Sequence, residues 1–495
     1  MKRTIFLLLL TLTSKILASH NIVLIVADDL DSELDGMTPL PSTRSLIGAQ
    51  GATYTNCFVA SPICCPNRAS ILTGKYQHNH KTMNNSMEGG CSSQEWQRTQ
   101  EKYTFASILK REMNYKTFYA GKYLNQYGTR AAGGPRYFPP GWDSWAGLVG
   151  NSKYYNYSLS VNGRERKYGD NPDTDYLTDV IGKLAVPFIN SQKNSDEPFL
   201  MVLSPPAPHA PFIPASRHSG KYKDVKAKKT PSFDIAGQTD KHWLVRMGPS
   251  PLPKSTMMLL DDTYRRRWET LAAVDEMVAK VHKALADNDL LSKTYVIFTS
   301  DNGYHIGQFS MPIDKRQPYE TDIKVPLLVI GPGISPSNIT APVSSVDLFA
   351  TILGIAGIEH PSDGTTILTP HLPADRTVLV EYRGERSEIP DITGCPTDSD
   401  MNLSHCSKDI ACKCEDSRNN TYACVRRVSD KHNNIFCVFE DDEKFVEAYD
   451  VHEDQYQLHN IGYSMKHRYR NKFRKRLKEM VQCEGEGCVR IGQNT

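Results

Sequence analysis

Between residue 20 and about residue 375 the chain alternates short apolar runs with amphipathic segments, and this alternation limits the possible folds more than any other feature. Leu271, Val274 and Val278 recur at helical spacing, whereas the apolar runs have the length of buried strands. Strands that alternate with helices predict a mostly parallel sheet with helices on both faces. The expected strands are Asn21–Ala27, Lys116–Ala120, Phe199–Leu203, Tyr295–Thr299 and Val325–Ile330, and the expected helices are Thr104–Glu112, Arg267–Leu285 and Val346–Leu353.

The last part of the chain differs in composition from this α/β region. Val378–Tyr382 and Tyr422–Val428 read as strands among Asn, Asp and Cys, which predicts a small, largely antiparallel domain. We therefore expect a catalytic-type domain at 20–375 and a smaller domain at 376–495. Eight of the twelve cysteines lie in the smaller domain, and their even number predicts disulfides whose pairing the spacing leaves open. They are Cys395, Cys406, Cys412, Cys414, Cys424, Cys437, Cys483 and Cys488.

Residues 1–19 have the basic start, short apolar centre and small final residues of a signal peptide, and they are too short for a spanning helix. Five Asn-x-Ser/Thr sequons add to the prediction of a soluble, glycosylated luminal or secreted protein, without a membrane span and with no role in binding nucleic acid. The net charge of +2 favours no particular partner, and the oligomeric state is left open, with a homodimer as one option. The sequons begin at Asn84, Asn156, Asn338, Asn402 and Asn419.

The stretch from Cys64 to Arg68 is the most specific local pattern. Pro66 suits the first turn of a helix, so Cys64 is expected just ahead of a helix N-terminus, a setting that favours anions and lowers the pKa of a thiol. Arg68 lies four residues further on and can face back toward the cysteine. Cys57, Cys65 and Cys91 are the other cysteines of this region; at least one should be unpaired, and Cys65 is the expected one.

Polar residues follow four of the expected strands, where each strand ends. In open α/β sheets the reactive crevice lies outside the carboxyl ends of the strands, so these groups should meet at one edge. Each has an ordinary alternative: turn or cap chemistry for the acidic pairs, a solvated lysine, a loop histidine, and a surface charge for Lys315. Their joint occurrence favours a site. Oxygen ligands from acidic and amide side chains would suit Ca²⁺ or Mg²⁺ rather than zinc. The strand-end residues are Asp28, Asp29, Lys122, His209, Asp301 and Asn302.

The pattern C-x-P-x-R followed by Ala69-Ser70-Ile71-Leu72-Thr73-Gly74 resembles the signature of the type I sulfatases. This resemblance spans nearly the whole mature chain and implies an alkaline-phosphatase-like fold with a smaller C-terminal domain. It also implies that a formylglycine-generating enzyme oxidises Cys64 to formylglycine during secretion. The hydrated aldehyde would then attack sulfur, and sulfate would leave from the covalent sulfoenzyme. By the same resemblance, one Ca²⁺ is held by Asp28, Asp29, Asp301 and Asn302 next to the modified Cys64, Arg68 orients the nucleophile, and Lys122, His209 and Lys315 bind the sulfate.

Further stretches resemble the branch of this family that removes 6-O-sulfate from N-acetylglucosamine in heparan sulfate and keratan sulfate. Among them are Lys75–His80, Gly121–Asn125, Ser152–Tyr157, Lys241–Leu244 and Asp301–His305. The resemblance implies a sulfated glycosaminoglycan substrate and a lysosomal location, with secretion as the alternative.

One position departs from the family pattern. Many sulfatases have a histidine two residues after the Gly-Lys lysine, where this chain has Leu124 followed by Asn125. Because an amide cannot act as a general base, the group that releases sulfate is in doubt. His305 is an alternative base.

The run Lys466–Lys478 is the one marked charge cluster. Its favoured interpretation is a helix docked through Tyr469, Phe473 and Leu477 with a solvated cationic face, and the alternative is a landing surface for a polysulfated glycosaminoglycan.

Three rival functions remain open. An endo-acting extracellular sulfatase should carry a long basic hydrophilic insertion, which this chain lacks. A phospho- or phosphonate ester hydrolase of the same superfold would need an ester assay to separate it. An inactive glycan-binding protein is disfavoured by the intact set of candidate ligands.

Overall fold

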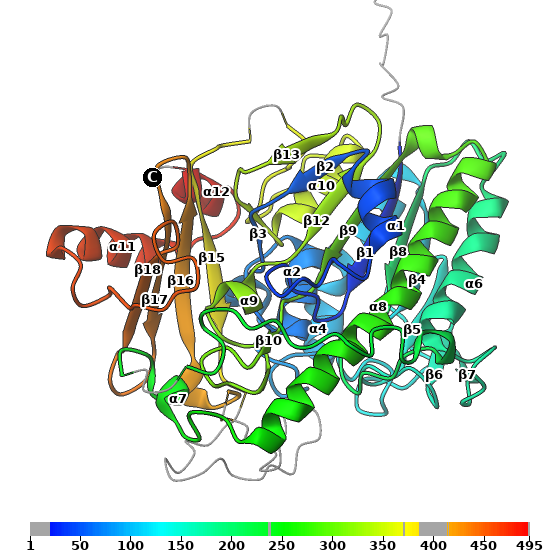
Figure 1. Ribbon diagram of the computed structural model, residues 1–495. Coiled ribbons are helices and arrows are strands. Elements are labelled where there is room, and N and C mark those ends of the chain that lie inside the picture. Colours follow the sequence, from blue (N-terminus) through cyan, green and yellow to red (C-terminus); the bar gives the residue numbers. More distant parts are fainter. Residues whose placement is uncertain (1–19, 236–238, 370–371, 386–412, 414, 494–495) are drawn as a thin grey trace, which may run out of the picture.

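The computed structural model describes residues 20–235, 239–369, 372–385, 413 and 415–493. A ten-stranded sheet runs through the middle of the molecule (Figure 1). Its five central strands, β9, β1, β8, β4 and β5, are parallel neighbours. In spatial order the strands are β13 (Ser337–Ile339), β2 (Ala52–Tyr54), β12 (Leu327–Ile330), β9 (Thr294–Ser300), β1 (Asn21–Ala27), β8 (Phe199–Ser204), β4 (Lys116–Gly121), β5 (Ser144–Leu148), β6 (Ser158–Val161) and β7 (Arg164–Lys167).

Helices cover both faces of this sheet (Figure 1). Alternate residues of β1 explain how: Ile22 and Leu24 face one apolar core, and Val23 and Ile25 face the other. The first core includes α2 (Cys64–Thr73), α5 (Phe105–Met113) and α10 (Asp347–Ile355), and the second includes α6 (Leu177–Ser191) and α8 (Lys254–Asp287), with α1 (Pro41–Thr43) against α8. The shorter elements are α3 (Gln77–His80), α4 (Gln94–Thr99), α7 (Trp243–Arg246), α9 (Glu320–Ile323) and the strand pairs β3 (Cys57–Phe58) with β14 (Val343–Ser344) and β10 (His305–Ile306) with β11 (Ile313–Asp314).

The predicted strands and helices are all present, with two differences in extent. The run that begins at Val325 becomes a strand only at Leu327, because Pro326 has no N–H to donate to a sheet ladder. That strand, β12, is antiparallel to β9. Helix α8 begins thirteen residues before Arg267, because its first turns carry Leu260 and Tyr264 toward a separate apolar cluster under the loops.

The C-terminal region forms its own four-stranded antiparallel sheet at the left of Figure 1. Its order is β15 (Arg376–Tyr382), β16 (Tyr422–Val428), β17 (Asn433–Phe439) and β18 (Val446–Asp450). Helices α11 (His467–Met480) and α12 (Glu486–Gln493) pack against it. The small antiparallel sheet expected from the sequence is therefore confirmed.

Disulfides correct one expectation. Cys65 pairs with Cys91, and the free cysteines among the described residues are Cys57 and Cys64, so the prediction that Cys65 is unpaired was wrong. The reason is tertiary: the first turn of α2 lies beside the loop that carries Cys91, with Cα atoms 6.0 Å apart. In the C-terminal sheet Cys424 pairs with Cys437, and Cys483 pairs with Cys488.

The signal peptide, Cys395, Cys406, Cys412, Cys414 and the sequon at Asn402 lie outside the described residues. Within the described part of the chain, no helix combines the length and apolar character needed to cross a membrane.

Candidate active site

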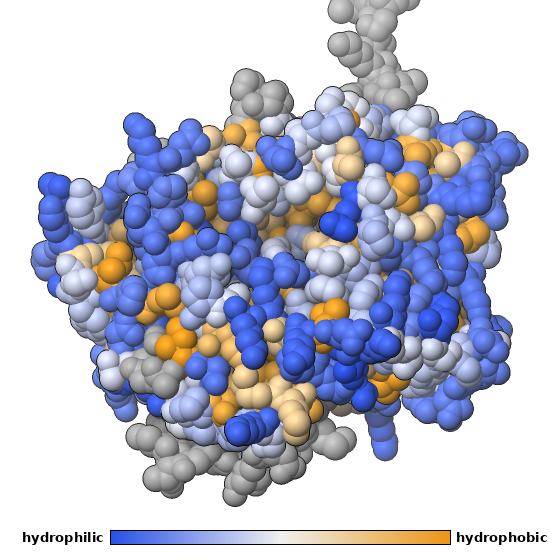
Figure 2. All heavy atoms as spheres, in the orientation of Figure 1, coloured by the Kyte–Doolittle hydropathy of each residue, from blue (hydrophilic) through white to orange (hydrophobic). Residues whose placement is uncertain are grey.

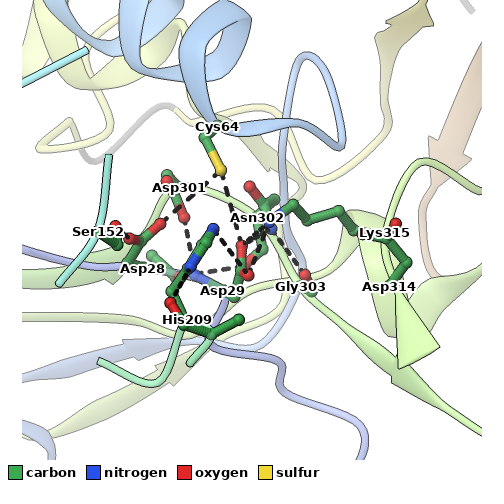
Figure 3. Close-up of polar contacts among 12 residues, drawn as sticks. Asp28, Asp29, Cys64, Ser152, His209, Asp301, Asn302, Gly303, Asp314 and Lys315 are labelled. Atoms are coloured by element: carbon green, nitrogen blue, oxygen red, sulfur yellow. Dashed lines mark hydrogen bonds and ion pairs between the residues drawn. The ribbon is translucent and has the colours of Figure 1, made fainter. Parts of the chain in front are cut away.

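Cys64 is the first residue of α2, one position further into the helix than the sequence predicted. Ile63 before it is extended (φ −153°), and Gly74 ends the helix with left-handed backbone (φ 66°). All ten residues of α2 are buried, so the helix is held by packing on every side. Figure 3 shows the Cys64 side chain pointing from the end of this helix into a group of polar side chains.

The first strand delivers two consecutive carboxylates to that group. In a regular strand Asp28 and Asp29 would point to opposite faces, but Asp29 has left-handed backbone (φ 71°), which breaks the alternation. The Sγ of Cys64 therefore lies 3.8 Å from one oxygen of each carboxylate. On the far side of the turn, the Arg267 guanidinium donates to the Asp29 carbonyl at 2.6 Å.

The strand next to β1 supplies a carboxylate and an amide, because β9 ends where Asp301 and Asn302 begin. Asp301 accepts a bond from the Asp29 N–H at 3.0 Å, and Asn302 donates to the Asp29 carboxylate at 2.7 Å. Gly303 follows because a Cβ there would lie 2.0 Å from the Thr321 carbonyl oxygen. The two strand ends are thus fastened directly to each other.

Two buried lysines compensate these carboxylates. Lys122, which follows β4, places its Nζ 2.8 Å and 3.0 Å from the two Asp28 oxygens. Lys315 reaches Asp29 from the loop after β11, at 2.6 Å and 2.7 Å. Gly121 allows β4 to pass close to β8 before the lysine, with φ 112° and no room for a Cβ beside the Ser204 carbonyl.

Arg68 and His209 complete the set of predicted residues. The Arg68 Nε donates to the Asp301 carboxylate at 2.7 Å, and its Nη1 donates to the Lys122 carbonyl and to Ser204. Its Nη2 has no hydrogen-bond partner among the described residues. The Nδ1 of His209 donates to the Ala210 carbonyl at 2.7 Å, which leaves Nε2 facing Asp29 at 3.8 Å.

The electrostatics of the group favour charged carboxylates at Asp28 and Asp29 and a neutral thiol at Cys64, whereas burial raises the pKa of Asp301 to about 6 although Arg68 opposes it. Burial opposes ionisation of Asp28 and Asp29, but the nearby cations, foremost Lys122 and Lys315 respectively, outweigh it and hold the pKa of both below its usual range. For Cys64 burial wins and raises the pKa of the thiol to about 12, despite Lys122 and Lys315. The lowering expected from the helix N-terminus is therefore absent, and a plain thiol here is a poor nucleophile.

The same residues offer a place for a hard cation. Four side chains each place one possible ligand atom within 4.8 Å of the others: Asp28, Asp29, Cys64 and His209. The amide oxygen of Asn302 is buried and has no hydrogen-bond partner in the described part of the chain. An orphaned acceptor beside two buried carboxylates fits an oxygen-coordinated divalent cation.

Sequence reasoning did not single out two residues that support the site. The Ser152 hydroxyl donates a hydrogen bond to Asp28. Arg267 on α8 donates to the Asp29 carbonyl, and its guanidinium carbon lies 4.1 Å from the centroid of the Tyr304 ring. Ser152 appeared only within a stretch that resembles the family. No local signal marks Arg267, because a charged residue in an amphipathic helix reads as solvent-facing.

Other predicted residues lie in different surroundings. Both ring nitrogens of His305 are engaged by carboxylates, Nδ1 by Asp322 at 3.0 Å and Nε2 by Glu415 at 3.2 Å. Burial would lower the pKa of His305, but these two carboxylates raise it well above the usual value. Asn125 is buried, and its amide oxygen has no partner among the described residues.

The four described sequons differ in exposure. Asn156 and Asn338 are exposed, and Asn419 is partly exposed. Asn84 is only 8% exposed, and its side chain bonds to Ser86 and to the Glu385 carbonyl, so a glycan there would have to displace packed structure.

Comparisons with known proteins agree with this geometry. The family model described as Sulfatase matches residues 20–358. The chain belongs to the sulfatase family. The N-acetylglucosamine-6-sulfatase of Capra hircus is 48% identical to this sulfatase over 477 residues, which is 94% of this chain and 84% of the goat protein. The Homo sapiens N-acetylglucosamine-6-sulfatase is 47% identical, over 94% and 85% of the two chains.

A solved structure confirms the fold. This sulfatase superposes with a TM-score of 0.73, at 20% identity and over 95% and 98% of the two chains, on a protein solved in complex with its substrate D-glucosamine-2-N,6-O-disulfate. The expected alkaline-phosphatase-like arrangement, a large sheet flanked by helices with a smaller antiparallel sheet, is the fold of this sulfatase.

Proposed function

We propose that this sulfatase hydrolyses the 6-O-sulfate ester of N-acetylglucosamine residues in heparan sulfate and keratan sulfate, as a step in glycosaminoglycan degradation. The observation that carries the proposal is the buried contact of Cys64 with Asp28 and Asp29, at 3.8 Å each, between two lysine ammonium groups. The 47–48% identity to N-acetylglucosamine-6-sulfatases over most of both chains supports this substrate.

We further propose Ca²⁺ as the cation, held by Asp28, Asp29, Asp301 and Asn302 beside the residue derived from Cys64. The all-oxygen donor set of carboxylates and an amide is the set that Ca²⁺ accepts and zinc does not favour. The orphaned Asn302 oxygen supports this choice. Formylglycine at position 64, once hydrated, would supply the oxygen nucleophile that the buried thiol cannot.

The protein side chains would then bind sulfate and move protons. Lys122 and Lys315 stay cationic: burial lowers the pKa of each, yet Asp28 and Asp29 raise it above the ordinary lysine value. Together with the Nη2 of Arg68, which makes no hydrogen bond in the described residues and lies 3.5 Å from Asp28, they would neutralise a sulfate group and the charge that grows on it during transfer.

His209 suits the proton-transfer role better than His305. Burial lowers the pKa of His209 despite Asp28 and Asp29, and its Nδ1 bond to the Ala210 carbonyl leaves Nε2 as the nitrogen that gains or loses a proton. We assign the protonation of the leaving sugar oxygen to His209 or Lys122. His305 donates at both nitrogens to carboxylates, so it has no free acceptor to serve as a base.

The wider setting follows from the same assignment. We propose a catalytic domain at 20–375 and a smaller domain at 376–495, which begins with the first strand of the antiparallel sheet. The predicted signal peptide and the exposed sequons Asn156 and Asn338 support passage through the secretory pathway to the lysosome, with secretion as the alternative. A formylglycine-generating enzyme would act on Cys64 during secretion, and a homodimer is one option for the oligomeric state.

Substitution of Cys64 tests the chemistry. Cys64→Ser should lower kcat for N-acetylglucosamine 6-sulfate at least a thousandfold while the unfolding temperature stays within a few degrees, because the buried serine replaces a single atom. Mass spectrometry of the wild-type peptide should find formylglycine at position 64. Appreciable turnover by protein with an unmodified thiol would contradict the mechanism.

The substrate assignment needs its own experiment. A panel of monosaccharides sulfated at different positions, together with phosphate and phosphonate monoesters, should give the highest kcat/KM for N-acetylglucosamine 6-sulfate. A preference for another sulfated sugar would overturn the substrate but keep the enzyme class. A preference for a phosphonate would overturn both.

A further inference from the structure

Helix α11 concentrates positive charge to a degree that the rest of the chain does not. The segment Lys466–Met480 contains eight Lys and Arg residues and one Glu, a net charge of +7. The whole chain carries only +2, so all other residues together carry −5. The charge is therefore a local feature of this helix.

The apolar side of α11 is already occupied by its own domain. Phe473 stacks on Phe436 of β17 at 5.5 Å between ring centroids, and Leu477 and Met480 are buried in the same cluster. Tyr469 was expected to continue this stripe but is 48% exposed, with the Arg468 guanidinium 4.7 Å above its ring. Docking by Phe473 and Leu477 fixes which side of the helix faces solvent.

The solvent-facing side is cationic along its length. Arg468, Lys472 and Lys475 follow one another at helical spacings of four and three, and Arg474 and Lys478 form a parallel row. All five are exposed. At 1.5 Å per residue the rows extend for about 15 Å, which is longer than a single sulfate or phosphate group.

These five cations contribute little to the stability of the fold through ion pairs. Within the described residues, Lys475 has one acidic neighbour, Glu479, at 3.9 Å. Both side chains are open to solvent, and an ion pair of this kind contributes little to the free energy of unfolding. Arg468, Lys472, Arg474 and Lys478 have no acidic group within 4.0 Å among those residues. In Figure 2 the end of the molecule that carries α11, at the left, is covered mainly by hydrophilic side chains.

We propose that the outer face of α11, defined by Arg468, Lys472, Arg474, Lys475 and Lys478, binds the chain of a sulfated glycosaminoglycan at a distance from the active site. Figure 1 places α11 on the far side of the C-terminal sheet, away from α2 and β1. The partner class rests on the proposed function, since a polysulfated polymer is the polyanion that this enzyme would meet. Such a surface raises the local concentration of polymer ends without touching the reacting sulfate.

The structure disfavours the other polyanionic partners. A helix that lies on an anionic membrane inserts its apolar side, but the apolar side of α11 is packed against β17 and leaves one exposed tyrosine. Nucleic acid is disfavoured by the predicted signal peptide, which assigns the chain to the secretory pathway.

The test compares charge-neutral variants of the full chain on immobilised heparin. Arg468→Gln, Lys472→Gln and Lys475→Gln are combined in one protein. The matched control combines Arg164→Gln, Arg166→Gln and Lys167→Gln on β7, an equally exposed cationic segment at the opposite edge of the molecule.

The helix variant should elute at lower salt, and its Kd for heparin at 0.15 M NaCl should rise about tenfold or more, with a salt-dependence slope lower by about three. The β7 variant should behave as wild type. For both variants kcat/KM on sulfated monosaccharide should stay unchanged, whereas KM for a long heparan sulfate substrate should rise only for the helix variant.

Unchanged heparin binding by the helix variant, or an equal loss in the β7 variant, would overturn the proposal. Charge-dependent binding to phosphatidylserine vesicles without binding to heparin would also overturn it. Because heparin binding needs no turnover, its loss in the helix variant would support the surface even if the monosaccharide panel rejected the proposed substrate.

Discussion

Asn302 shows at the scale of one residue how the site is built for a cation. Its amide nitrogen donates to Asp29 and to the Gly303 carbonyl, whereas its amide oxygen is buried with no partner in the described structure. Leaving a buried acceptor unpaired costs about 1–3 kcal/mol, so the fold is stabilised when a cation binds the Asn302 oxygen.

Substitution of Asn302 should therefore weaken Ca²⁺ binding. Asn302→Ala is expected to raise the Kd for Ca²⁺ about tenfold or more, because it removes one oxygen ligand and one bond that orients Asp29. Thermal unfolding of chelator-treated protein titrated with Ca²⁺ measures this without an activity assay. Asn56→Ala is the control: it removes a hydrogen bond that the Asn56 amide nitrogen donates to the Thr340 carbonyl at the surface, and it should leave the Ca²⁺ shift unchanged.

A second residue-scale prediction concerns the base that replaces the missing family histidine. His305→Gln should lower the unfolding temperature, since it removes a cation between Asp322 and Glu415, and should change kcat less than Asn125→Ala does. Steady-state kinetics on folded protein measure the difference. A large loss of kcat in His305→Gln alone, with normal stability, would restore His305 as the candidate base.

At the scale of elements, an aromatic layer under β4 and β5 contains a buried carboxyl. Glu101 accepts bonds from Trp96 at 3.0 Å and from Tyr123 at 3.3 Å, and also from Tyr137. Burial raises the pKa of Glu101 to about 7 although these donors oppose it. The loop after β4 carries both Lys122 and Tyr123, so the residue next to the site lysine contacts this acid.

This raised pKa predicts greater stability in acid. In the unfolded chain Glu101 ionises near its ordinary pKa of 4.5, and in the fold only near 7. The free energy of unfolding should therefore fall as pH rises from about 4.5 to 7, by up to about 3 kcal/mol from this group. Denaturant unfolding of Glu101→Gln should lack that component, so its stability relative to wild type should be greater at pH 7.5 than at pH 4.5.

Glu95→Gln is the control for this prediction, because Glu95 is 61% exposed and, among the described residues, forms its ion pair with Arg98 on the surface. It should follow the wild-type pH profile. An identical pH profile for Glu101→Gln and wild type would contradict the role given to Glu101.

At the scale of the whole molecule, a buried ion pair joins the C-terminal sheet to helix α10, which packs in one core of the large sheet. The Arg376 guanidinium, at the start of β15, binds both oxygens of Asp347 at the start of α10, at 2.6 Å and 2.8 Å. Asp347 also accepts bonds from the N–H groups of Ser344 and Thr365. The carboxylate therefore holds the C-terminal sheet, α10, β14 and the loop that carries Thr365 in one arrangement.

Removing one partner should be costly. Arg376→Met leaves Asp347 buried and unpaired and should lower the free energy of unfolding by about 3–5 kcal/mol. Arg376→Met combined with Asp347→Asn should lose less, because the amide carries no buried charge and its oxygen still accepts from one of the two N–H groups, Ser344 or Thr365. Denaturant unfolding of the single and double variants measures the coupling, and additive losses would contradict it.

Much of the fold could be predicted because parallel strands buried on both faces are continuous apolar runs. β1 coincides with the predicted Asn21–Ala27, and β16 coincides with Tyr422–Val428. β12 was harder to place, since its antiparallel pairing to β9 depends on a chain reversal and leaves no periodicity of its own. The first thirteen residues of α8 were missed for a related reason, because the apolar stripe at this end of the helix faces loops instead of the sheet.

By itself the sequence determined which residue types stand at the strand ends and which cysteine lies at the start of α2, to within one residue, because these follow from local patterns. Only the tertiary structure decided the pairing of Cys65 with Cys91, the Ser152 and Arg267 supports, and the engagement of His305 by two carboxylates. It also decided the protonation of Cys64, since the loss of water around a buried thiol outweighs the neighbouring lysines. Burial and long-range contacts set these properties, and neither is encoded in the spacing of residues along the chain.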